Sequence, residues 1–488
     1  MKRTLLVFLL VNLVLSACAP VSAPTPTPAP SATPLPTATP LPTATPTPAP
    51  TATPTPIPTI QVGDLSVPDP RATNPELFDL RNPNAPIPQF VNAVKMAGIE
   101  ITAEQVAQGI TFVSNKKDGT PLKVDNKPVI LGVYRISKNN ISYALIFTFT
   151  EEKGWHPYLT TLAQANNIRL GNMINPESES FYKMFNLGVA VATFDLPPSS
   201  PKPINYTYAL SQIDFLRKRD PESQIRFHHI IDPIGMYDWF AGKSYSSEQM
   251  KEYLIHLVQQ TMRDIEGKVN SVVVVNEPYI EIDRPNDPFW EKLGYDYIDI
   301  AFQAAREVNS EIELIYNDSM NHSLVDPEEN GYTTSLTKRT ISRLKGKGLV
   351  DAVGMQMHIR AGNPPTKNDV IATMKSYEIP VHVTECDVDL SDIKGSQEDR
   401  FTLQAKIYRD IVAACIESGV CKSVTFWGKS DDTSWLEVNS GRRNADPTLF
   451  ISLPNGESTP KPAYYAIADL LLENLLNKEL DFGKNSAK

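Results

Sequence analysis

Two glutamates stand where strongly apolar runs of the sequence end. Glu277 follows SVVVVN, so that Asn276 precedes it directly, and Glu385 follows VHVT. Two carboxyl groups about 5–5.5 Å apart can break a glycosidic bond with retention, one protonating the leaving oxygen and the other attacking the anomeric carbon. An isolated Asn-Glu pair is a weak signal, because Asn276 could cap a turn and Glu277 could pair with a surface lysine. Two glutamates at the ends of two buried strands are a much stronger signal.

The elements that would carry these glutamates form a repeating pattern. From about Gly154 onward, short apolar runs alternate with amphipathic stretches such as SSEQMKEYLIHLVQQTMRDI. The runs lie at residues 168–174, 189–194, 225–231, 271–275, 312–316, 352–358, 381–385 and 423–427. This alternation predicts an α/β fold, a (β/α)8 TIM barrel. A doubly wound open sheet is the alternative, but no glycine-rich phosphate loop follows the first strand.

Polar and aromatic residues gather at the carboxyl ends of these runs, which meet at one mouth of such a barrel. They are His228, His229, Asn276, Glu277, Tyr316, Asn317, Asp318, Gln356, His358, Thr384, Glu385, Asp387, Trp427 and, shortly after, Trp435. Hydrogen-bonding groups around a flat apolar face suit a sugar ring. The sequence therefore predicts a carbohydrate-binding cleft at the mouth.

Some of these residues have a purely structural alternative. Two histidines and two tryptophans could belong to the core: His228, His358, Trp427 and Trp435. We interpret Asp387 as a supporting acid. We interpret the segment 316–318 as a turn and assign no chemistry to it.

Six segments resemble motifs of glycoside hydrolase family 10, the family of endo-β-1,4-xylanases. They are SVVVVNE, IYNDSMNH, DAVGMQMH, IPVHVTECDV, SVTFWGKSDDTSWL and STPKPAYYAI, and the resemblance extends from about residue 155 to 470. It implies a retaining hydrolase that cleaves xylan or a related β-1,4-linked plant polysaccharide or oligosaccharide, with no cofactor and no metal.

The resemblance also implies roles for single residues. Glu277 would be the general acid/base and Glu385 the nucleophile, while Asn276 would bind the sugar 2-OH. His358 would lie beside the nucleophile, held by Asp387. The remaining candidates for substrate binding are Gln356, near the same sugar, Trp427 and Trp435, walling the glycone side, and His228.

The chain also departs from the family pattern. Family members carry Glu-Asn-x-Met-Lys-Trp after the second strand, where this chain reads LGVAVATFDLPPSS, with Asp195 as the nearest polar residue. After the third strand, Asp232 and Pro233 replace a Trp-His pair, and Val272-Val273 replace the Trp-Asp that leads the fourth strand. A site that loses partners for sugar hydroxyls loses affinity, so we expect altered glycone specificity and weak binding of plain xylan.

These losses leave other functions open. One is a surface lipoprotein that binds glycans on a catalytically weakened hydrolase scaffold, although the retained glutamate pair argues against it. Another is hydrolysis of a mannan or a β-glucan. Endo or exo cleavage and the oligomeric state are not predicted by any pattern here.

The N-terminal segments predict export from a bacterial cell. Residues 1–18 join a basic MKR to an apolar run and end in LSAC, which resembles a lipoprotein signal that would place a lipid anchor on Cys18. Residues 19–60 are a Pro/Thr/Ala-rich linker, a semi-rigid spacer. Residues 61–150 alternate in polarity and predict a small, β-rich accessory unit, and residues 151–475 the hydrolase domain.

The net charge argues against nucleic-acid binding, and the cysteines predict a disulfide rather than a zinc site. The formal net charge of −10 gives no basic patch for nucleic acid. Cys415 and Cys421 could close a small disulfide loop in an exported chain, which leaves Cys386 as a buried thiol. The cysteines and histidines lack the spacing of a zinc site.

Overall fold

The computed structural model describes residues 56–175, 184–194, 204–240, 242–279, 287–324, 330–438, 440–453, 458–476 and 485–486. The chain divides into two units, Met1–Pro58 and Thr59–Lys488. The predicted signal with Cys18, and the linker up to residue 55, lie outside the described residues. Within the described ranges, no helix combines the length and the apolar character that a bilayer crossing needs.

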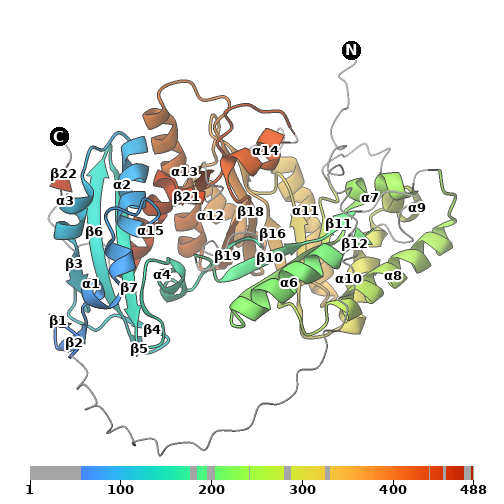
Figure 1. Cartoon of the computed structure of the whole chain (residues 1–488). Helices are drawn as coiled ribbons and strands as arrows, with labels where there is room; N and C mark the ends of the chain where they lie inside the picture. The colour runs from blue at the N-terminus through green and yellow to red at the C-terminus, as the bar shows by residue number, and fades with distance from the viewer. Residues whose placement is uncertain are drawn as a thin grey trace, which may run out of the picture. The chain divides into compact units, whose positions relative to one another are not determined.

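The second unit contains a closed barrel of parallel strands, which confirms the predicted fold class (Figure 1). Its strands are β9 (Arg169–Met173), β10 (Leu187–Val191), β13 (Gln224–Ile231), β14 (Ser271–Asn276), β15 (Glu313–Asp318), β16 (Ala352–Met355), β18 (Val381–Asp389) and β19 (Cys421–Phe426). Each strand pairs with the next in this order, and β19 returns to pair with β9. Each strand overlaps one of the apolar runs in the sequence.

Helices follow the strands and cover the barrel from outside. They are α4 (Thr160–Ala165), α6 (Thr207–Arg219), α7 (Pro233–Phe240), α8 (Ser247–Asp264), α9 (Pro288–Leu293), α10 (Asp296–Val308), α11 (Asn330–Gly346), α12 (Lys367–Ser376), α13 (Gln397–Ser418) and α15 (Pro462–Leu475). Local sequence sets their ends: Ser246 and Ser396 form capping boxes that start α8 and α13. Gly419, at φ 71°, ends α13 in the left-handed region that glycine adopts readily.

The valine run of β14 is buried on both faces of the strand. Val272 and Val274 belong to the large core between barrel and helices, whereas Val273 packs with Ile315 and Ala352 in a separate apolar cluster. Side chains of a strand alternate between the two faces of a sheet, so the second cluster fills the inside of the barrel. This explains why four successive valines precede the polar residues at the strand end.

Short elements surround the carboxyl ends of the barrel strands. They are β11 (Thr193–Phe194), β12 (Ile204–Asn205), β17 (His358–Arg360), η2 (Asp431–Thr433), α14 (Trp435–Val438), β20 (Phe450–Ser452) and β21 (Ser458–Pro460). Buried Lys461 donates to Asp431 Oδ2 at 2.9 Å and to the carbonyl of Asp446 at 2.7 Å. This contact ties the segment before α14 to the start of α15.

A strand-rich unit precedes the barrel, as predicted, and it also contains helices. Its elements are β1 (Thr59–Val62), β2 (Leu65–Pro68), α1 (Pro70–Thr73), η1 (Pro75–Phe78), α2 (Pro86–Met96), α3 (Ala103–Gly109), β3 (Thr111–Val113), β4 (Lys123–Val124), β5 (Lys127–Pro128), β6 (Ile130–Lys138), β7 (Ile141–Thr150) and β8 (Gly154–His156). Near the chain end, β22 (Asn485–Ser486) pairs with β6.

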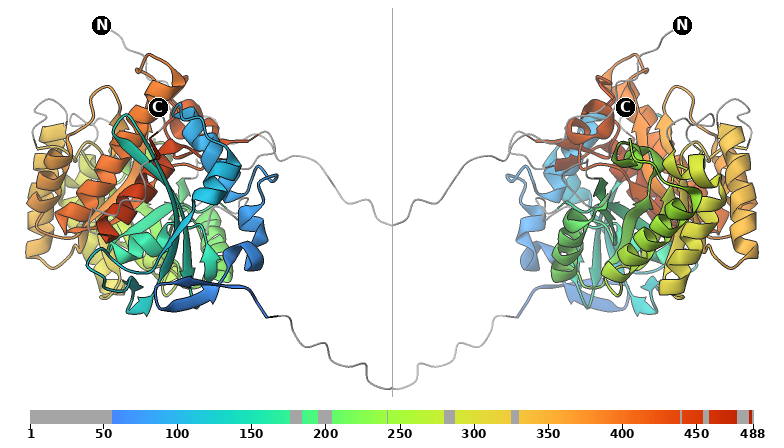
Figure 2. Two further views of the ribbon diagram at one scale, coloured as in Figure 1. Left: turned by 90° about the vertical axis from the view of Figure 1, so that its left-hand side faces the viewer. Right: turned by 90° about the vertical axis from the view of Figure 1, so that its right-hand side faces the viewer.

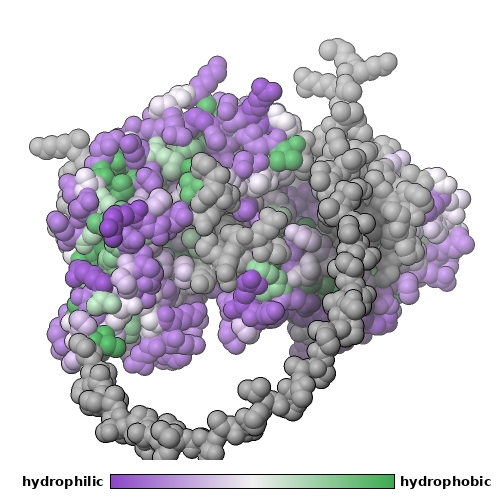
Figure 3. Space-filling view, in the orientation of Figure 1, coloured by the Kyte–Doolittle hydropathy of each residue, from purple (hydrophilic) through white to green (hydrophobic). Residues whose placement is uncertain are grey.

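This unit packs against the last helix of the barrel domain. Figure 2 shows β6, β7 and α2 beside α15, and Arg135 of β6 donates to Asp469 Oδ2 of α15 at 3.0 Å. The unit therefore packs on the barrel domain. In the view of Figure 3 the described surface is mainly hydrophilic, with small separate apolar patches.

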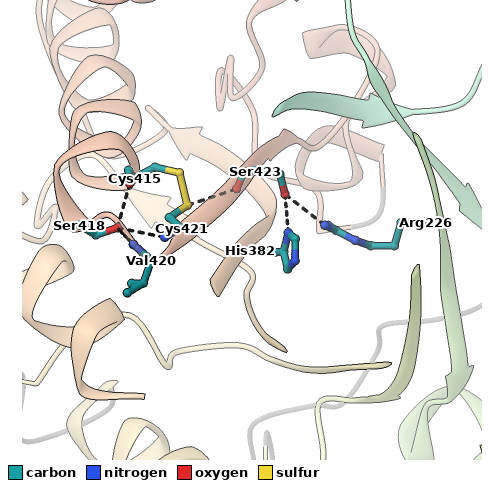
Figure 4. The surroundings of a disulfide bond; sticks show 7 residues. All are labelled: Arg226, His382, Cys415, Ser418, Val420, Cys421 and Ser423. Atoms are coloured by element: carbon teal, nitrogen blue, oxygen red, sulfur yellow. Dashed lines mark hydrogen bonds between the residues drawn. A yellow bond between two sulfur atoms is a disulfide. The ribbon is translucent and has the colours of Figure 1, made fainter. Parts of the chain in front are cut away.

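The predicted disulfide between Cys415 and Cys421 is present and joins the end of α13 to the start of β19. Figure 4 shows Ser423, two residues further on, accepting from Arg226 Nη2 at 3.1 Å and hydrogen-bonded to His382 Nδ1 at 2.8 Å. Cys386 is a buried free thiol, also as predicted.

Candidate active site

The chain turns sharply where β14 ends. Glu277 has a φ of 48°, in the left-handed region that residues with a Cβ rarely adopt. Its N–H donates to the carbonyl of Asn317 at 3.0 Å, and its Oε1 accepts from Gln356 Nε2 at 2.8 Å. Strained backbone of this kind persists where the surroundings hold it, and it clusters at active sites. The strand therefore departs from extended geometry at its acidic residue.

Three buried amides connect the two glutamates. Asn317 Nδ2 donates to Glu385 Oε1 and to Asn276 Oδ1, both at 2.7 Å. Gln356 Nε2 donates to Asn276 Oδ1 at 3.2 Å in addition to Glu277. Hydrogen-bond networks in a buried environment fix the orientation of every member. The carboxyl groups of β14 and β18 thus belong to one rigid arrangement.

Glu385 is surrounded by groups that favour its anion. Burial opposes ionisation, but contacts with His228, His358 and Asn317 together lower the pKa of Glu385, and because His228 is itself neutral, His358 and Asn317 carry this effect around neutral pH. His228 Nε2 lies 3.4 Å from Oε1 and His358 Nε2 lies 3.4 Å from Oε2. Glu385 is therefore a carboxylate around neutral pH.

The two histidines beside Glu385 differ in charge. Burial lowers the pKa of His228 to about 3, so its ring is neutral. For His358, burial also disfavours the charged form, but Asp387 and Glu385 raise its pKa to about 10. Its Nδ1 lies 2.9 Å from Asp387 Oδ2. His358 is thus a cation held between two carboxylates.

Two tryptophans flank these histidines. Trp435 Nε1 donates to Asp387 Oδ2 at 2.8 Å, and its ring lies 5.1 Å from that of His358. The ring of Trp427 lies 5.2 Å from that of His228. Trp435 is 38% exposed, so part of its ring remains accessible to a ligand.

Glu277 has the opposite electrostatic environment. Burial, together with the negative charges of Asp232, Glu385 and Asp318, raises its pKa to about 8, while the hydrogen bond from Gln356 acts in the opposite direction. Two carboxyl groups whose environments separate their pKa values can serve as acid and nucleophile. Around neutral pH, this site holds a protonated Glu277 and an ionised Glu385.

Comparison with known families agrees with this geometry. The model of glycosyl hydrolase family 10 matches residues 167–470. The chain belongs to glycosyl hydrolase family 10. This match covers the barrel and includes every residue of the arrangement just described.

Individual family 10 proteins are similar at modest identity. A thermostable celloxylanase of Thermoclostridium stercorarium is 29% identical over 58% of this chain and 79% of its own length. Endo-1,4-beta-xylanase B of Neocallimastix patriciarum is 27% identical over 59% of this chain, but only 32% of its own length is covered. The crystal structure of native xylanase 10B from Thermotoga maritima shares the fold, with a TM-score of 0.56 and 24% identity over 66% of this chain and 99% of that one.

The structure brings the predicted site residues together. Asn276, Glu277, Gln356 and Glu385 share the amide network, and His228 and His358 contact the nucleophile candidate. The tryptophans adjoin these histidines. Their individual roles stay predictions.

Two further residues belong to this family 10 site but were not assigned to it from the sequence. Asn317, interpreted as part of a structural turn, bridges Asn276 and Glu385. The parallel register pairs it with Asn276 on the neighbouring strand, so two asparagines at adjacent strand ends were the available signal. Asp232, noted only as a departure from the family pattern, raises the pKa of Glu277.

The expected loss of donors after the second strand falls largely outside the described residues. Asp195 and the segment 195–203 lie outside the described residues. The third-strand departure is described: Pro233 begins α7, and Asp232 directly precedes it.

Proposed function

We propose that this chain is a retaining, endo-1,4-β-xylanase-like glycoside hydrolase that cleaves xylan or a decorated relative of it. The observation that carries the proposal is the division of charge between two linked carboxyl groups, a protonated Glu277 and an ionised Glu385. Membership of family 10 and the xylanase names of its relatives support the substrate class.

The reaction would proceed in two steps. Glu385 attacks the anomeric carbon while Glu277 donates its proton to the departing oxygen, which leaves the sugar as an ester on Glu385. Glu277, now a carboxylate, then takes a proton from water as that water attacks the anomeric carbon and releases Glu385. Each turnover consumes one water, and both carboxyl groups return to their starting states.

The groups around Glu385 would control its nucleophilicity and position. Asn317 and His358 hold its two oxygens separately, Oε1 through the amide at 2.7 Å and Oε2 near the imidazole at 3.4 Å. Fixed donors stabilise the carboxylate when it is regenerated in the second step.

We propose further that the glycone side differs from that of the xylanases it resembles. The replacement of Trp-His by Asp232 and Pro233 removes donors and adds an anion close to Glu277. A polar site discriminates strongly against a ligand that leaves its groups unpaired. We therefore expect weaker turnover on plain xylan than on a decorated or related glycan.

Product analysis on defined xylo- and gluco-oligosaccharides tests the function. We expect hydrolysis with a β-anomer as the first product, a loss of about 10²–10⁴-fold in Glu277→Gln, and a larger loss in Glu385→Gln. Glu378→Gln, at a side chain that is 79% exposed, is the matched control and should keep full activity. Binding of oligosaccharides without product from the wild type would favour the glycan-binding alternative instead.

A further inference from the structure

Asp232 lies in the corner between β13 and α7, and residues of these two elements hold its side chain. Its Oδ1 accepts from the N–H of Gly235 at 3.0 Å, and its Oδ2 lies 3.2 Å from His229 Nε2. Only 15% of its side chain is exposed. The carboxylate is therefore held in one orientation before any substrate arrives.

The same carboxylate also reaches the neighbouring strand. The parallel register pairs Ile231 with Val275, so Asp232 and Asn276 follow side by side at adjacent strand ends, and the Asn276 side chain helps to lower the pKa of Asp232. Asn276 Oδ1 is already an acceptor for Asn317 and Gln356. Because Oδ1 already accepts from two amides, Nδ2 is the end of the Asn276 side chain that can donate to Asp232, and Asn276 is the residue next to the general acid.

Asp232 is an anion in this corner. Burial raises its pKa, but the hydrogen bond and charge of His229, the Gly235 N–H and the Asn276 side chain together bring it below the ordinary value. Its charge acts on Glu277 more strongly than that of Glu385 does. Of the neighbouring groups in the described residues, Asp232, Asp318 and Glu385 oppose ionisation of Glu277, while Gln356 favours it.

In the described part of the chain, the contacts of the mouth histidines go to carboxyl groups other than that of Glu277. His228 and His358 contact Glu385, and His358 also contacts Asp387. His229 lies against Asp232 on the β13 side.

We propose that Asp232 is a positioning residue for the general acid, which fixes the Asn276 amide and sets the alkaline limit of hydrolysis by placing a third carboxylate beside Glu277. This inference rests on the proposed function. It assigns a functional part to a residue at which the chain departs from the family pattern.

The pH dependence of kcat/KM tests the proposal. Glu277 must carry its proton to act as acid, so activity should fall as the pH rises through its pKa of about 8. Asp232→Asn keeps the size and the acceptor but removes the charge, so the alkaline limb should move down by about one pH unit or more. Asp232→Ala should shift the limb similarly and also lower kcat/KM on the acid side, because Asn276 loses its partner.

The matched control is Asp410→Asn, the same loss of charge on outer helix α13, which should leave the limb in place. A uniform loss of activity in both Asp232 variants, with an unmoved limb, would mean a merely structural role and would overturn the proposal.

A measurement without turnover separates this inference from the proposed function. A carboxyl ¹³C NMR titration of the wild-type enzyme, with the Glu277 signal assigned by Glu277→Gln, should show Glu277 titrating near pH 8. The midpoint should fall in Asp232→Asn. A wild-type midpoint near the ordinary 4.5 would overturn the inference even in an active enzyme, whereas a midpoint near 8 in an inactive protein would contradict only the proposed function.

Discussion

The two glutamates of the site show how neighbouring groups give one residue type two opposite chemical properties. Glu385 is contacted by the Asn317 amide and by the cationic imidazole of His358, which favour its anion. Glu277 accepts from the Gln356 amide and, within the described residues, faces three carboxyl groups, which raise its pKa together with burial. Both side chains are buried or nearly so, so burial alone cannot distinguish them. The difference lies in what the adjacent strands supply: donors around β18 and acids around the end of β14.

The amide of Asn317 joins Glu385 to Asn276, the neighbour of Glu277. Among the residues around the two glutamates, its removal should lower activity most. Asn317→Ala takes a donor from Glu385 and leaves Asn276 Oδ1 with one donor fewer. Loss of one preorganised donor at an anionic site costs about 10²–10³-fold in rate. We therefore expect kcat to fall by this factor on xylo-oligosaccharides, with a smaller change in KM.

A second buried asparagine supplies the control for Asn317→Ala. Asn166 donates to the carbonyls of Leu162 and Leu471 at 2.7 and 3.1 Å, away from the strand ends that form the site. Asn166→Ala should lower thermal stability but spare kcat. Equal losses of kcat in both variants would show that Asn317 acts through the fold alone.

Weakening the positive charge on His358 should have the next largest effect on activity. Asp387→Asn removes the carboxylate that helps to raise the pKa of His358, so that pKa falls and Glu385 loses part of its stabilising cation. The pKa of Glu385 then rises. The acid limb of kcat/KM should move up by about one pH unit, while the alkaline limb, which depends on Glu277, stays in place.

This prediction is the counterpart of Asp232→Asn. One substitution should move the acid limb and the other the alkaline limb, since each acts on a different glutamate. Movement of the alkaline limb in Asp387→Asn would contradict the assignment of the two limbs to different glutamates.

The sequence was sufficient for the barrel and for the glutamates, but not for their environments. Strand positions follow from apolar runs, and Glu277 and Glu385 follow from where those runs end. The role of Asn317 depends on its register with Asn276 across two strands, and that of Asp232 depends on a turn into α7. These are three-dimensional relations between residues that a linear pattern treats separately. The pairing of β22 with β6, from opposite ends of the folded unit, was hidden for the same reason.

The smallest expected effect concerns the outermost donor on the nucleophile side, Trp435. Its Nε1 donates to Asp387 Oδ2 at 2.8 Å, so that it reaches Glu385 only through Asp387 and His358, and the residue is 38% exposed. Trp435→Phe keeps an aromatic face for a sugar but removes the donor. A hydrogen bond of this kind contributes about 1 kcal/mol, so we expect a rise in KM of about five-fold with kcat nearly unchanged.

The control for Trp435→Phe is Trp155→Phe in the N-terminal unit. Trp155 Nε1 also donates, to the carbonyl of Pro68 at 2.9 Å, but it lies in the sheet that packs on α15. That variant should lose stability and keep its KM. If Trp435→Phe instead shifted the acid limb as strongly as Asp387→Asn, the tryptophan would control the charge of His358 rather than merely hold Asp387 in place. The set of residues that control the pKa of Glu385 would then reach beyond Asp387 and His358.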